Sequence, residues 1–128
     1  MISITIFQKN NVSYGFKIKG HALSREQMES ETGDVYDLIC NSISVLSQSA
    51  VIGITEVLKL PVKYDTENGF LQMNLFNLKA KDVESAQVLL LTFEKSLESV
   101  IMSLEASFGK KKCKEYIKLL KKEVQDIC

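Results

Sequence analysis

Hydrophobic and polar residues alternate along the first twenty positions of the chain, as they do in β-strands with one buried face. The alternation runs over residues 2 to 8 and resumes from Val12 to Ile18. Between the two runs, Lys9-Asn10-Asn11 supplies side chains that favour a turn. The pattern therefore predicts an antiparallel hairpin that ends at Gly20.

A helical period replaces this alternation in the next part of the chain. Apolar residues recur every three or four positions from about Leu38 to Lys59, which predicts a helix over this range. Asp37 stands at the N-cap position, and Pro61 ends the helix. The preceding segment, Ala22 to Tyr36, is polar with one glycine, Gly33, and has the length of a functional loop.

The second half of the chain repeats this order of elements. Asn68-Gly69 divides an alternating stretch from Val62 to Leu75, which predicts a second hairpin. A second helix is expected from Asp82, as its cap, to Phe108, with Gly109 after its end. Residues 115–124 fit either a strand or a helix.

These elements define an α+β fold, in which two hairpins form a sheet covered by two helices. The length of 128 residues and the hydrophobic content of 45% suit a single domain, residues 1–128. Sixteen basic and sixteen acidic residues cancel, so net charge gives no reason to expect a nucleic-acid or membrane partner. The alternating start lacks the features of a signal peptide, and we expect a cytoplasmic protein with reduced thiols.

Cys40 and His21 are the candidates for chemistry. With Asp37 as the cap, Cys40 falls in the first turn of the helix, where free N–H groups and the helix dipole favour a thiolate. His21 is the only histidine of the chain and follows a strand. A thiol with an imidazole base fits nucleophilic catalysis, although from position alone a buried structural cysteine and an ordinary histidine remain open.

Two further polar side chains share the helical stripe of Cys40. Ser44 lies one turn after it and either supports a substrate or bonds to the carbonyl of Cys40 itself. Asp37 either orients His21 or only caps the helix. One histidine and scattered cysteines do not build a metal site, so we expect no metal and no cofactor.

Two short elements resemble the signature of the ribosomal-processing cysteine proteases. Gly20-His21-Ala22 ends a strand, and Asp37-Leu38-Ile39-Cys40 opens a helix with Ser44 four residues later. The resemblance implies His21 as general base and Cys40 as nucleophile, with Asp37 and Ser44 as supporting groups. Gly20 and Ala22 would shape the turn, and a loop over residues 22–36, with Gly33, would close over the substrate. The segment between His21 and Cys40 is longer and more polar than this family leads us to expect.

The same resemblance implies a homodimeric endopeptidase that removes the N-terminal extension of a large-subunit ribosomal protein by cleavage after phenylalanine. It also favours a strand for the tail, at Glu115 to Lys118. Two other classes of protein remain open. The lysine-rich segment after Gly109 fits a non-catalytic RNA-binding module, although lysines there also complement a helix dipole, and a dimeric scaffold without a site would bury Cys40.

Overall fold

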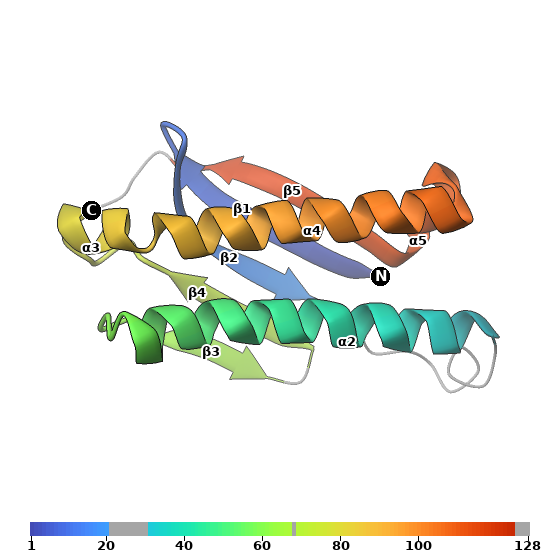
Figure 1. Cartoon of the computed structure of the whole chain (residues 1–128), viewed down its shortest axis with the longest axis horizontal. Helices are drawn as coiled ribbons and strands as arrows, with labels where there is room; N and C mark the ends of the chain where they lie inside the picture. Colours follow the sequence, from blue (N-terminus) through green and yellow to red (C-terminus); the bar gives the residue numbers. More distant parts are fainter. Residues whose placement is uncertain (21–30, 68, 125–128) are drawn as a thin grey trace.

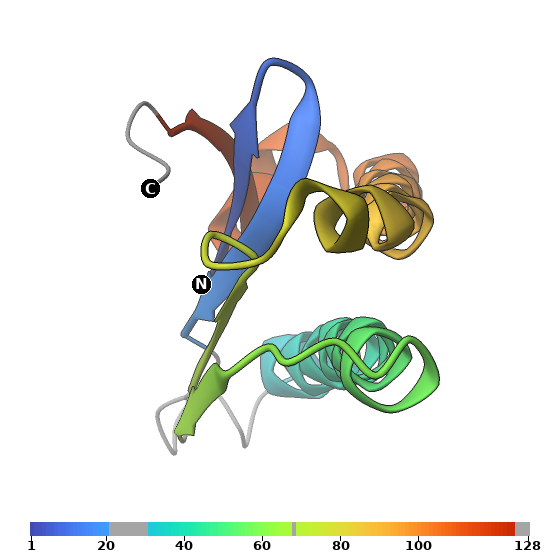
Figure 2. The same cartoon turned by 90° about the vertical axis from the view of Figure 1, so that its left-hand side faces the viewer.

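The chain folds into a five-stranded sheet with its long helices on one face (Figures 1 and 2). This computed structural model describes residues 1–20, 31–67 and 69–124, and for residues 31–37 it describes the backbone only. In chain order the elements are β1 (Ile2–Lys9), β2 (Val12–Lys19), α2 (Glu31–Ile52), the π-helical turn η1 (Gly53–Val57), β3 (Tyr64–Glu67), β4 (Phe70–Asn74), α3 (Ala80–Ser85), α4 (Gln87–Phe108), α5 (Lys110–Tyr116) and β5 (Ile117–Glu123). The strand order is β3-β4-β2-β1-β5. The predicted α+β class is confirmed.

Both predicted hairpins are present. β1 pairs with β2 in antiparallel orientation, and Asn10 and Asn11 between them have φ values of 51° and 66°. Two successive positive φ values match the twist of the flanking strands, and asparagine tolerates them better than most residues. β3 and β4 are also antiparallel, and β4 pairs with β2, which joins the two hairpins into one sheet.

The tail of the chain contains both a helix and a strand. Gly109 ends α4 with a φ of 85°, and its N–H donates to the carbonyl of Glu105 at 2.8 Å. After the short helix α5, β5 pairs in parallel with β1, with Ile2 opposite Ile117 and Ile4 opposite Leu119. The strand favoured for the tail is therefore present and covers the second edge of β1, but it begins at Ile117, and Glu115 and Tyr116 of the predicted strand belong to α5.

Both long helices differ from the prediction at their starts. α2 begins at Glu31, so Asp37 and Gly33 lie within the helix and not at its N-cap or in a loop. Acidic residues in the first turns of a helix interact favourably with its dipole, which accounts for the earlier start. In the second helix Lys79, not Asp82, is the N-cap, and a break at Ala86 separates α3 from α4.

The hydrophobic core fills the space between the sheet and the helical layer. Ile4 and Phe16 of the sheet are fully buried, as is Leu97 of α4. The rings of Phe16 and Phe93 are 4.4 Å apart between centroids, so α4 packs directly on the central strands. Aromatic pairs at this distance contribute beyond their buried area.

The helical segment Leu38–Val57 is long and apolar enough to cross a membrane by length and composition alone. In the structure it packs on the sheet, and Ile39, Ile43 and Ile54 are buried. A helix that covers a sheet has this composition too. Only 39% of its most apolar window is buried, however, so much of the segment's apolar surface remains exposed.

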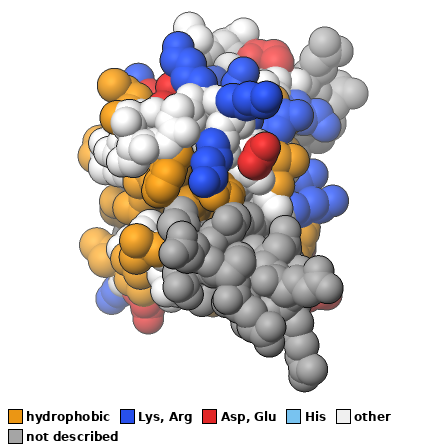
Figure 3. All heavy atoms as spheres, turned by 90° about the vertical axis from the view of Figure 1, so that its right-hand side faces the viewer, with side chains coloured by type: hydrophobic (Ala, Val, Ile, Leu, Met, Phe, Trp, Pro, Cys, Tyr) orange, Lys and Arg blue, Asp and Glu red, His pale blue; other side chains and the backbone are white. Residues whose placement is uncertain are grey.

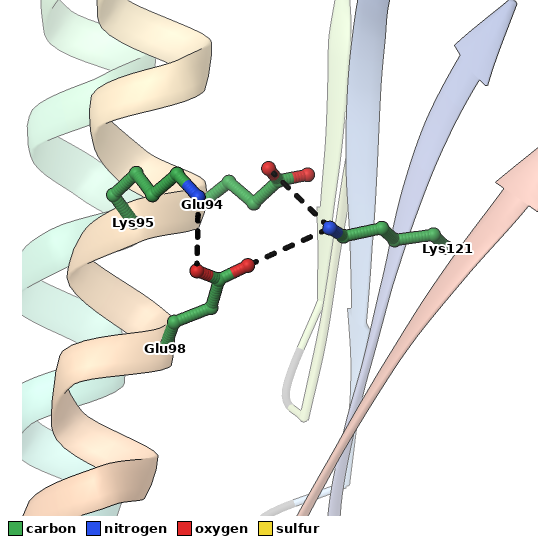
Figure 4. A network of polar contacts seen from close by, with 4 residues as sticks. All are labelled: Glu94, Lys95, Glu98 and Lys121. Carbon is green, nitrogen blue, oxygen red and sulfur yellow. Dashed lines mark hydrogen bonds and ion pairs between the residues drawn. The ribbon is translucent and has the colours of Figure 1, made fainter. Parts of the chain in front are cut away.

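An ion-pair network connects β5 to α4 on the helical side of the sheet (Figure 4). Lys121 Nζ lies 3.7 Å from a carboxylate oxygen of Glu94 and 3.5 Å from one of Glu98. Glu94 is 7% exposed, whereas the side chain of Lys121 is 43% exposed, so the ion pair joins a buried carboxylate to a partly exposed ammonium group. The network ties the last strand to the helix that covers the sheet.

Replacing Lys121 with methionine should lower the free energy of unfolding by about 1–2 kcal/mol, because it leaves the buried Glu94 carboxylate without its cation in a partly solvated site. Urea denaturation measures this change. The control is Lys122→Met, which removes a neighbouring lysine from the opposite face of the sheet and should have little effect. Adding Glu94→Gln to Lys121→Met should restore part of the loss. Equal stability of the two single variants would contradict the prediction.

Candidate active site

A groove of about 670 Å³ lies between α2 and the β3–β4 hairpin, at the end of the sheet where β2 finishes. One wall is a strip of α2, and the other is the hairpin. The lining residues are Ile2, Ile18, Gly20, Cys40, Asn41, Ile43, Ser44, Ser47, Gln48, Val51, Ile52, Tyr64, Thr66, Glu67, Gly69, Phe70 and Leu71. The groove is therefore polar along part of the helix and largely apolar toward the sheet.

Cys40 lines this groove with a partly exposed side chain. It is the tenth residue of α2, in the third turn and not in the first. In the third turn the backbone N–H groups are already hydrogen-bonded within the helix. The unpaired N–H groups and the partial positive charge at the N-terminus of α2 therefore do not act on Cys40. The predicted activation by the helix N-terminus is wrong, and a nearby base becomes the more important requirement.

Ser44 and Ser47 continue the stripe of Cys40 along the groove. Ser44 Oγ accepts a hydrogen bond from Gln48 Nε2 at 2.9 Å, and Ser47 Oγ donates to the carbonyl of Ser44 at 3.0 Å. Ser44 is exposed, whereas Ser47 is buried at 3% exposure. The bond from Gln48 places the Ser44 hydroxyl along the groove wall, beside another side chain that lines the groove.

Gly20 holds the end of β2 against the two neighbouring strands. Its N–H donates to the carbonyl of Gly69 at 2.9 Å, and its φ of 83° is one that glycine adopts readily. A Cβ atom at this position would lie 2.3 Å from the carbonyl oxygen of Met1. A side chain at residue 20 would therefore displace the backbone at the mouth of the groove.

The other predicted site residues are placed only in part. His21 and Ala22 lie outside the described residues, as does most of the predicted 22–36 loop. Residues 31–36 of that segment are helical, so Gly33 belongs to α2. For Asp37 the structure places the backbone within α2, one turn before Cys40, which excludes the capping role.

Cys113 differs from Cys40 in its surroundings. It is 2% exposed, and its Sγ lies 3.9 Å from the carbonyl oxygen of Ile101. Burial, with the nearby charge of Glu105, raises the pKa of its thiol. A buried neutral thiol is a poor nucleophile, so Cys40 is the reactive candidate of the two. Within the part of the chain that the structure describes, no three His, Cys, Asp or Glu side chains lie together as a metal site would require.

The hairpin wall is the part of the groove that sequence reasoning missed. Tyr64, Phe70 and Leu71 are distant from Cys40 in sequence and line the same groove because β4 pairs with β2 and β3 pairs with β4. No local pattern marks such residues. Gln48 was also missed, although it lies on the helical stripe of Cys40 and Ser44 and its spacing could have indicated it.

The fold and the groove with its exposed thiol are those of a small cysteine peptidase. The model of the cysteine protease Prp family matches residues 1–111, and the chain belongs to this family. It is accordingly a cysteine peptidase. A comparison with curated protein sequences finds no match.

Solved structures share the fold at low sequence identity. The essential ribosomal processing protease Prp from S. aureus in complex with a substrate peptide has a TM-score of 0.71 at 18% identity, over 95% of this chain and 100% of that one. The same protease with a covalently linked product peptide has a TM-score of 0.61 at 19% identity, with the same coverage. SMU.848 from Streptococcus mutans has a TM-score of 0.67 at 19% identity, over 97% and 96% of the two chains.

Proposed function

We propose that this protein is an endopeptidase that removes the N-terminal extension of a large-subunit ribosomal protein in the cytoplasm, by cleavage after phenylalanine. The observation that carries the proposal is the place of Cys40, a partly exposed thiol in a groove with an apolar hairpin wall, in a chain of the Prp family. The S. aureus relative is described as a ribosomal processing protease with a substrate peptide, which supports the substrate class.

In the proposed mechanism Cys40 is the nucleophile and His21 is the general base. The imidazole takes the thiol proton, and Sγ attacks the scissile carbonyl to form a tetrahedral intermediate. The imidazolium then donates that proton to the leaving amine, which departs with the C-terminal product. A water, deprotonated by the same imidazole, hydrolyses the thioester and frees the N-terminal product. Because α2 offers no unpaired backbone N–H groups at Cys40, the hydrogen-bond donors that stabilise the oxyanion must be backbone N–H groups of other segments or side chains such as that of Ser44.

The composition of the groove supports a phenylalanine at the cleavage position. Ile18, Val51, Phe70 and Leu71 supply apolar and aromatic surface near the polar strip that contains Cys40. A phenyl ring gains free energy by leaving water for such a surface. Ser44 and Gln48 are then available to hydrogen-bond the extended backbone of the peptide.

The test is incubation with a peptide that copies the N-terminal extension of the ribosomal protein of the same organism, analysed by mass spectrometry. A single cut after phenylalanine is expected, and a peptide with that phenylalanine replaced by aspartate should not be cleaved. Cleavage at another position would contradict the proposed preference for phenylalanine. A peptide that remains intact would contradict the proposal that this ribosomal protein is the substrate. Membership of a cysteine peptidase family argues against the alternative of a non-catalytic RNA-binding module.

We also propose that two copies of the chain associate through an outer apolar patch on the helical layer. The patch consists of Leu38, Val45 and Ile52 of α2 with Val88, Leu91 and Met102 of α4, which are between 41% and 75% exposed. Clustered exposed apolar side chains mark interaction surfaces. Ile52 also lines the groove, so a partner on this patch would lie beside the active site.

Val45→Asp should convert the dimer to a monomer. Val45 is 65% exposed in the single chain, and a carboxylate at this position would have to lose its hydration when the two copies associate, which costs free energy. Sedimentation velocity measures the change. Lys81→Asp, on exposed α3, is the control and should leave the dimer intact. A wild-type monomer at micromolar concentration, or a Val45→Asp dimer, would contradict the proposal.

A further inference from the structure

Charge is unevenly distributed along a chain that has no net charge. Residues 110–123 contain seven lysines and two glutamates, a net charge of +5. The remaining residues contain nine basic and fourteen acidic side chains, a net charge of −5. The overall balance that argued against an anionic partner therefore conceals a strongly basic segment.

The basic segment is exposed in the structure. It forms α5 and β5, which follow each other without a linker at Tyr116 and Ile117. Lys110, Lys111, Lys112 and Lys114 of α5 are all exposed. Figure 3 shows lysine side chains gathered over the upper half of the end of the molecule where α5 lies.

The strand register extends this basic surface across the sheet. On β5, Ile117 and Leu119 alternate with Lys118 and Lys122, so these two lysines lie on the face opposite the helices. On the same face, Ser3 of β1 lies between Lys118 and Lys19 of β2, and the next row contains Lys17. We call Lys17, Lys19, Lys118 and Lys122 the open-face lysines.

The described part of the chain supplies no ion-pair partner to the open-face lysines. Lys121, which points to the helices, is paired with Glu94 and Glu98, but within the described residues none of the open-face lysines forms an ion pair. The acidic residues of the same sheet face, Asp65 and Glu67, are on β3 at the far edge. The carboxylate of Glu123, the residue after Lys122, accepts a hydrogen bond from the backbone N–H of Asn10 at 3.0 Å.

We propose that this open face of the sheet binds the phosphate backbone of RNA while the opposite, helical side bears the peptide groove. Neighbouring strands lie about 5 Å apart, so Lys19 of β2 and Lys118 of β5, with β1 between them, are about 10 Å apart, and Lys17 and Lys19 are about 7 Å apart along β2. One polyanion can therefore contact several of the open-face lysines. Such contacts are independent of sequence and release counterions. The choice of RNA among polyanions rests on the proposed ribosomal substrate, because that substrate is assembled on RNA.

An anionic membrane fits this face less well. Membrane-surface binding combines basic side chains with large apolar ones that enter the lipid. Leu120, at 47% exposure, is the large apolar side chain that β5 exposes, whereas the outer apolar patch is on the helices. The register also places Leu120 in the row of Thr5 and Lys17 and pairs Phe70 with Lys19. The open face otherwise offers charge and the hydroxyls of Ser3 and Thr5, which suit phosphate and sugar contacts.

The test measures RNA affinity in the Cys40→Ala variant, so that its result is independent of peptide cleavage. The probe is a fluorescein-labelled single-stranded RNA of about 20 nucleotides, followed by anisotropy between about 50 and 200 mM KCl. In the open-face variant the four open-face lysines are changed to glutamine, as K17Q/K19Q/K118Q/K122Q. The matched control is K59Q/K63Q/K79Q/K81Q, which removes four exposed lysines from other segments and gives the same net charge.

We expect binding that weakens as KCl rises, a loss of at least about tenfold in affinity for the open-face variant, and a shallower salt dependence. The control variant should bind like the parent, and circular dichroism should show both to be folded. Absence of binding at low salt, equal loss in both variants, or binding to phosphatidylglycerol vesicles but not to RNA would each overturn the proposal. When the four open-face substitutions are made in a chain that keeps Cys40, the rate of peptide cleavage should be unchanged. This assay distinguishes failure of the RNA-binding proposal from failure of the proposed protease function.

Discussion

Replacing Cys40 with alanine should lower kcat/KM for the ribosomal peptide by at least about a thousandfold. The substitution removes the sulfur that forms the thioester, and no other thiol lines the described groove. The peptide should still bind, because the apolar wall and the polar strip of α2 are unchanged. Cleavage rate and peptide affinity, measured separately, should therefore show a loss confined to the chemical step.

Cys113→Ala provides the matched control for this result. Cys113 is buried, burial raises the pKa of its thiol, and it does not line the groove, so the variant should keep its activity. Iodoacetamide should label Cys40 faster than Cys113 in a chain whose Cys128 is changed to alanine. Full activity of Cys40→Ala, or loss of activity with Cys113→Ala alone in a folded protein, would refute Cys40 as the nucleophile.

The largest effect on stability is expected for Gly15→Ala, at about 3 kcal/mol or more in the free energy of unfolding. Gly15 lies in β2 with a φ of 136°, where β4 pairs closely against it. An added Cβ would lie 2.1 Å from the carbonyl oxygen of Met73 and 2.7 Å from Cα of Asn74. Both are backbone atoms, so the β2–β4 pairing itself would have to separate.

Gly109→Ala separates this contact from backbone strain alone. Gly109 also has a positive φ, 85°, but an added Cβ would meet no atom within 4 Å. The expected loss is therefore about 1 kcal/mol, the cost of the unfavourable φ. Urea denaturation of the two variants gives the comparison. Similar losses would show that the close approach of β2 and β4 is not the constraint.

Local signals account for the elements that the sequence predicted correctly. The hairpins follow from alternation and from Asn10-Asn11 and Gly69, which accept the positive φ values of tight turns. The end of α4 follows from Gly109. The start of α2 was misplaced because the polar residues before Asp37 carry little apolar periodicity, and an acidic helical turn resembles a loop in such a pattern.

The sequence alone determined the two hairpins, the apolar faces of the two long helices, and the choice of Cys40 as the candidate nucleophile, because turns and side-chain periodicity depend on near neighbours. The tertiary structure decided which segments meet. Pairing of β4 with β2 places Leu71 in the groove that Cys40 also lines, and pairing of β1 with both β2 and β5 places Lys118 and Lys19 on either side of Ser3. These contacts join residues that are far apart along the chain, and only the register of the folded sheet fixes them.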